Sequence, residues 1–172
     1  MFVMKQLTIF IALALIVLTT SQSLTVQSDD SIAFETIVKD TESGISEESF
    51  FLITTRNDWK KLWKGVYSIF PVRPPFPEFD FSSQMIIAAF SGSEGAGVSI
   101  SIESITRGDE QLRINVTQTI RTGPRCPPRD AAIHHPFHIV VLEKVAKPAR
   151  KNAEFILETE QKDCDTSSSE QG

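Results

Sequence analysis

All three histidines of this 172-residue chain lie close together, as His134, His135 and His138. Imidazoles in a cluster can bind zinc, and a histidine near Cys126 could activate that thiol as a nucleophile. A stable zinc site needs three or four converging ligands, however, and no carboxylate or thiol stands at a recognised spacing. The Pro-rich surroundings of Cys126 offer no evident means of lowering its pKa. We therefore expect no metal site, no cofactor and no catalytic residue, with a histidine metal cluster and a cysteine nucleophile as the alternatives.

A glycine-rich segment, residues 92–97 (GSEGAG), is the other candidate for ligand binding. A phosphate loop needs a lysine and a hydroxyl residue that open a helix, whereas this segment opens a strand pattern and includes an acidic residue. No GxSxG elbow occurs in the chain, so an esterase-type serine has no support. We expect a hairpin loop. The candidate binding residues, in this loop and before a later strand, are Gly92, Ser93, Glu94, Gly95, Gly97, Pro136 and Phe137.

The amino terminus has the three-part pattern of a secretory signal peptide. Lys5 gives a positive start, residues 7–18 are apolar and uncharged, and small residues lie at Ser21 and Ser23. A membrane-spanning helix needs about 20 apolar residues, so a retained anchor is the weaker alternative. The first cysteine is Cys126, which argues against a bacterial lipid anchor. We expect cleavage of residues 1–23 and a secreted protein, periplasmic or extracellular, without stable membrane insertion.

The two cysteines, Cys126 and Cys164, both lie in the exported part of the chain. In an oxidising compartment an even pair more often forms a disulfide than remains as reactive thiols. We therefore expect a Cys126–Cys164 bridge. It would attach the carboxyl-terminal strand to the loop around Cys126.

Charge and length restrict the classes of partner. Removal of residues 1–23 leaves 16 basic and 22 acidic side chains, a formal net charge of −6. Nucleic acid requires a basic face and an anionic membrane requires a polybasic patch, so we expect neither as a partner. Residues 24–162 have the usual size of a single domain. Residues 163–172 are polar and lack large apolar side chains, so we expect a flexible tail.

Seven segments have the composition and alternation of β-strands: residues 33–39, 48–54, 85–90, 98–105, 111–120, 137–145 and 154–159. Residues 85–90 (MIIAAF) are apolar throughout, as in a central strand that is covered on both faces. From Met85 onward, short turns between strands indicate a β-meander. The expected fold is α+β, a mainly antiparallel sheet with one amphipathic helix packed on it.

The one helical pattern places Trp59 and Trp63 on a single apolar stripe. Thr55 and Asp58 resemble a capping box, which predicts a helix over residues 56–68. A short amphipathic helix must bury its apolar stripe, so we assign both tryptophans to the core rather than to an exposed binding platform.

The Pro-rich segment that follows, residues 70–81, contains four prolines and can form neither a helix nor an interior strand. We expect a surface connection whose phenylalanines pack against the core. Recognition of this segment by a partner domain is the alternative.

Several short sequences follow one another in a suggestive order: DWKKLW, DFS, an apolar strand that ends at Gly92, GVSISIESI and HPFHIV. In this order they resemble the carboxyl-terminal domain of the PrcB family of protease-complex subunits, over residues 50–146. Gly95, Gly97, Pro136 and Phe137 match the family pattern. The chain differs from it at Val98, where the family has an aromatic residue, and at Phe137, where it has tyrosine. The physical interpretation of the matching residues is structural: glycines for a tight turn, Pro136 at the start of an edge strand and Phe137 packing inward.

The resemblance implies an exported, non-catalytic domain that associates with or stabilises a protease. A weaker likeness, in the layout of the loops, is to chagasin-type cysteine-protease inhibitors, which makes a secreted inhibitor the alternative. A small hydrolase is the third and weakest alternative. It ranks last because no set of nucleophile, base and orienting residue is evident.

Overall fold

The computed structural model describes residues 30–108, 111–124, 126, 133–145 and 152–164. The expected signal peptide, residues 1–23, and residues 165–172 of the expected tail lie outside this range. Within it, no helix is both long and apolar enough to cross a membrane.

The described elements are seven strands and one helix. Their bounds are β1 (Phe34–Asp40), β2 (Glu48–Ile53), α2 (Arg56–Val66), β3 (Gln84–Ser91), β4 (Val98–Arg107), β5 (Leu112–Thr122), β6 (Phe137–Glu143) and β7 (Ala153–Asp163). Each corresponds to a segment with a matching pattern in the sequence. The predicted α+β class, rich in antiparallel strands, is confirmed.

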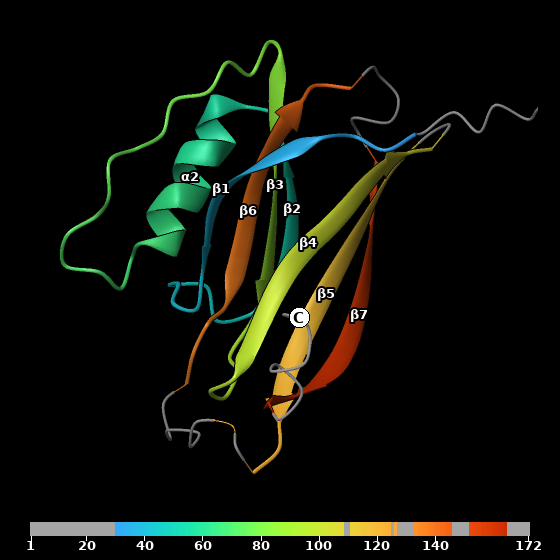
Figure 1. Ribbon diagram of the computed structural model, residues 1–172. Coiled ribbons are helices and arrows are strands. Elements are labelled where there is room, and N and C mark those ends of the chain that lie inside the picture. Colours follow the sequence, from blue (N-terminus) through green and yellow to red (C-terminus); the bar gives the residue numbers. More distant parts are fainter. Residues whose placement is uncertain (1–29, 109–110, 125, 127–132, 146–151, 165–172) are drawn as a thin grey trace, which may run out of the picture.

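The strands form two sheets, of order β1-β6-β3-β2 and β4-β5-β7 (Figure 1). The hairpin of β4 and β5 is a meander step, as predicted. In contrast, β3 and β4 are consecutive in the chain but belong to different sheets. The β5–β7 pairing is parallel because β6 returns the chain to the end where β5 begins. The other pairings between named strands are antiparallel.

The core has two parts, one on each face of the four-stranded sheet. On β3, Met85, Ile87 and Ala89 face the three-stranded sheet. The alternate residues of the same strand face the helix and the Pro-rich connection. β3 is therefore buried on both faces, as its continuous apolar sequence predicts, and the domain has three layers (Figure 1).

Helix α2 begins and packs as its sequence predicts. The Thr55 hydroxyl accepts a hydrogen bond from the Asp58 amide and donates one to the Asp58 carboxylate. Trp59 is fully buried, and its indole Nε1 donates to the Pro77 carbonyl over 2.9 Å. Phe76 packs against the same cluster. The Pro-rich connection is thus attached to the helix by its aromatic side chains.

The folded domain extends slightly beyond the expected boundary at residue 162. β7 continues to Asp163, and Cys164 is bonded to Cys126. The sequence of these last two residues is polar, so their order comes from pairing and the disulfide rather than from burial.

Candidate functional site

Three connections between strands lie at the same end of the domain. β1 ends at Asp40 opposite Phe137, where β6 begins, and β2 begins at Glu48 opposite Ser91, where β3 ends. The connections that leave these strands are therefore neighbours (Figure 1). We call this region the loop-end surface and define it as residues 41–46, 92–97 and 134–136.

The two loops singled out in the sequence pair directly within this surface. The Glu94 amide donates to the His134 carbonyl, and the His134 amide donates to the Glu94 carbonyl, both over 2.8 Å. The Glu94 carboxylate also accepts a hydrogen bond of 2.8 Å from the Gln118 side chain of β5. Glu94 is therefore held at both its backbone and its side chain.

The β1–β2 connection joins both of the other loops. The Ser93 hydroxyl donates to the Ser46 carbonyl over 3.1 Å, and the His135 amide donates to the Thr41 carbonyl over 2.9 Å. His134 Nδ1 and the Glu42 carboxylate form an ion pair when the imidazole is protonated. These contacts between segments distant in sequence fix the relative positions of the three loops.

The glycines of this surface have different roles. Gly92 is buried with φ of 81°, and a Cβ there would lie 2.8 Å from the Glu48 amide nitrogen, so the position requires glycine. Gly97 also has a positive φ, of 85°. Gly95 does not, and a Cβ at Gly95 would meet no atom within 4 Å. Ser93, Gly95 and Gly97 are exposed, so these small residues form the accessible part of the loop.

The other two candidate binding residues lie inside the fold. Phe137 is fully buried and stacks on Phe90, with ring centroids 5.7 Å apart. The predicted inward packing of Phe137 is therefore confirmed. Pro136 is buried and its carbonyl accepts from the Ser91 amide. The strand that follows, β6, lies between β1 and β3, so the prediction that Pro136 begins an edge strand is wrong. Proline fits because it precedes the strand and removes no donor from its ladder.

The three histidines point to different surroundings. His138 is only 4% exposed and lies between the two sheets, where Nδ1 accepts from the Ile102 amide over 2.9 Å. The pKa of His138 is lowered to about 4, mainly by burial and also by the charge of Lys39, while Glu103 opposes the change. His134 contacts Glu42 instead. Among the described residues, no group of three or more metal-ligating side chains converges.

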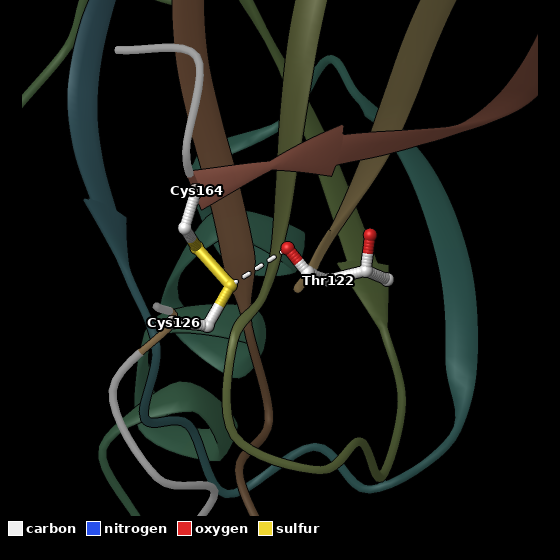
Figure 2. Close-up of a disulfide and its surroundings, with 3 residues drawn as sticks. All are labelled: Thr122, Cys126 and Cys164. Carbon is white, nitrogen blue, oxygen red and sulfur yellow. Dashed lines mark hydrogen bonds between the residues drawn. A yellow bond between two sulfur atoms is a disulfide. The ribbon is translucent and has the colours of Figure 1, made fainter. Parts of the chain in front are cut away.

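The predicted disulfide joins Cys126 and Cys164, with Cα atoms 5.2 Å apart. The Thr122 carbonyl oxygen lies 2.9 Å from Cys126 Sγ, and Figure 2 shows this contact beside the bridge. A disulfide sulfur has no hydrogen to donate, so this is a carbonyl–sulfur contact. The bridge fixes the start of the β5–β6 connection to the end of β7. Because Cys126 is bonded, it is not available as a nucleophile.

Sequence reasoning missed three residues that organise the surface: Glu42, Ser46 and Gln118. Of these, Gln118 gives a signal in the sequence, because it interrupts the inward-facing apolar alternation of β5. Glu42 and Ser46 lie in a connection without periodicity, and nothing in the sequence relates them to residues so far along the chain.

Comparisons with known proteins give no match to a family model, a curated protein or a solved structure. The resemblance to the PrcB family therefore stays a prediction, and the functional proposal below depends on the geometry of the chain itself.

Proposed function

We propose that this chain is an exported, non-catalytic domain that binds an exported protease through its loop-end surface and so associates with or stabilises that protease. The observation that supports it most is the pair of backbone hydrogen bonds between Glu94 and His134. They unite the two segments that match the PrcB pattern into one surface.

A surface of this kind suits protein recognition. Binding is weakened by the entropy lost when loops become ordered, and loops already held by hydrogen bonds lose less. Here the contacts of Ser93 and His135 with the β1–β2 connection provide that order. The small, exposed residues Ser93 and Gly95 leave the surface open to a partner's side chains.

Export is supported by two features of the chain. The amino-terminal pattern is that of a cleaved signal peptide. The Cys126–Cys164 disulfide is a type of bond that persists mainly in oxidising compartments outside the cytoplasm.

A secreted protease inhibitor is the second candidate, and one observation favours it. The β1–β2, β3–β4 and β5–β6 connections lie at one end of the domain, which is the layout by which a loop-based inhibitor would block a cleft. A hydrolase has less support, since Cys126 is in a disulfide and His138 is buried between the sheets.

Affinity capture of the mature protein from the native exported fraction tests the proposal, with the captured proteins identified. We expect a protease among them, and loss of its capture in Gly95→Arg, at an exposed position where an added Cβ meets no atom within 4 Å. The matched control is Ala33→Arg, which adds the same side chain at an exposed position next to β1, at the end remote from the loops. Capture of no protease by the wild-type protein under gentle conditions would overturn the proposal.

The two candidates are separated by activity. The captured protease is assayed with and without added protein. An associated subunit leaves hydrolysis intact and raises the yield or the thermal lifetime of the protease. An inhibitor lowers hydrolysis in proportion to its concentration, and Gly95→Arg relieves the effect.

A further inference from the structure

A cavity of about 730 Å³ lies between the exposed side of α2 and the Pro-rich connection. It is separate from the loop-end surface. Its walls include Trp63, Pro74 and Phe76, and its rim includes Arg56, Lys60, Lys64 and Arg73. Its volume is within the range of small-molecule sites, about 300 to 1,000 Å³.

The charge around the cavity is opposite in sign to that of the whole chain. The chain has 17 basic and 22 acidic side chains, yet four cations and a single carboxylate line this cavity. The carboxylate, Glu78, forms an ion pair with Arg56. Within the described part of the chain, none of the other three cations takes part in a salt bridge. The cavity is therefore positively charged.

The cations on the helix are regularly spaced. Arg56, Lys60 and Lys64 follow one another at intervals of four residues, so they lie along one side of α2. A rise of about 1.5 Å per residue separates successive positions by about 6 Å. Arg73 approaches from the connection on the other side. A ligand with several anionic groups could contact cations from both walls.

Trp63 contributes an aromatic ring to the wall of the cavity. Its side chain lines the cavity, the residue is only 7% exposed, and its buried Nε1 has no hydrogen-bond partner among the described residues. The neighbouring Trp59 differs, because its Nε1 is bonded to the Pro77 carbonyl. Because less than 1 Å² of the Trp63 Nε1 atom is exposed, a ligand in the cavity contacts the indole ring rather than this nitrogen.

We propose that this cavity binds a small polyanionic ligand, with two or more carboxylate or sulfate-type groups arranged around an apolar ring. The anionic groups contact Lys60, Lys64 and Arg73. The ring packs against Phe76, Pro74 and the indole of Trp63. The site requires no partner protein, so it can be tested on the isolated domain.

Titration with benzene-1,3,5-tricarboxylate, followed by ¹H–¹⁵N NMR of the indole groups, tests the site. The chain contains two tryptophans, so two indole signals are expected, which Trp63→Phe assigns. We expect a saturable shift of the Trp63 signal with a millimolar dissociation constant, larger than the shift of the Trp59 signal. Affinity should fall as salt is added. Benzene-1,3,5-trisulfonate forms a second arm that distinguishes carboxylate from sulfate-type recognition.

Three charge-removing variants provide the matched comparison. Lys60→Gln and Lys64→Gln should each weaken tricarboxylate binding about threefold, and the double variant about tenfold. The control is Lys61→Gln, because Lys61 is on the same helix but pairs with Asp58 and does not line the cavity. These positions are exposed, so the variants should fold.

Four results would overturn the proposal. The uncharged benzene-1,3,5-trimethanol could shift the Trp63 signal as much as the tricarboxylate does. Lys61→Gln could weaken binding as strongly as Lys60→Gln. The shift could fail to saturate below about 50 mM for both anions. Finally, a tetraglutamate peptide could bind more tightly than either small anion, which would assign the site to an acidic protein segment instead.

Discussion

The Ile102 amide of β4 donates a hydrogen bond of 2.9 Å to Nδ1 of His138 on β6, and this bond connects the two sheets. β4 is an edge strand, so the bond satisfies an edge amide that would otherwise lack a strand partner. An amide can only donate, so Nδ1 is unprotonated and the neutral ring has its hydrogen on Nε2. Nε2 in turn donates to the Thr36 hydroxyl of β1 over 2.9 Å.

Acid should destabilise the domain through His138. Its pKa is about 4 in the folded state, mainly because of burial, against about 6.5 in the unfolded chain. Between these values the unfolded chain binds a proton that the folded chain does not. The free energy of unfolding should therefore fall from pH 6.5 to pH 4, by roughly 3 kcal/mol, and be unaffected by this group above pH 6.5. Chemical denaturation across this range measures the slope.

A matched pair of variants assigns that slope to His138. His138→Asn removes the titration but offers an acceptor near the position of Nδ1, so its stability should vary less with pH. His135→Asn should keep the wild-type slope. An unchanged slope in His138→Asn would show that another group causes it. The lowered pKa of Asp80 adds to the slope only near the acid end of this range, because an unfolded aspartate binds few protons above about pH 5.

Alanine should be tolerated at Gly95 and not at Gly92. At Gly92 a Cβ would lie 2.8 Å from the Glu48 amide nitrogen, and φ of 81° is strained for any residue with a side chain. We expect Gly92→Ala to cost more than about 1 kcal/mol of unfolding free energy and Gly95→Ala to change it by less than about 0.5 kcal/mol. Thermal melts of the two proteins compare them directly. Equal melting temperatures would contradict the backbone description of this loop.

Loss of the Cys126–Cys164 bridge should lower stability by about 4 kcal/mol, because it closes a loop with a sequence separation of 38. Denaturant titration of the double variant Cys126→Ser/Cys164→Ser measures this loss. The wild-type protein in a reducing agent is the internal control and should lose a similar amount. If oxidised and reduced proteins unfold together, the bridge does not constrain the unfolded chain as described.

Removal of the helix cap should have a smaller effect. The Thr55 hydroxyl accepts from the Asp58 amide over 3.2 Å, and we expect Thr55→Ala to cost about 1 kcal/mol. The comparison is Thr159→Ala on β7, where the exposed hydroxyl makes only a 3.5 Å contact and the change should be within about 0.5 kcal/mol. Denaturation midpoints of the two variants are compared. A larger fall in Thr55→Ala supports the capping role, whereas equal falls would show that any threonine-to-alanine change has this effect.

The sequence by itself determined the elements and most of their buried faces. The Thr55 cap, the tryptophan stripe of α2 and the doubly buried β3 follow from interactions between residues a few positions apart, so their patterns are readable along the chain. The disulfide was also predictable, because the chain contains only two cysteines.

The tertiary structure alone decided which strands are neighbours. An alternating strand has the same pattern whichever strand it pairs with, so nothing local separates β3 from β4 or places β7 parallel to β5. The meeting of Glu94 with His134 and the position of His138 between the sheets depend on that arrangement. The cavity beside Trp63 likewise exists only because the Pro-rich connection returns along the helix. Such contacts join residues distant in the chain, and the free energy of the whole packed domain selects them.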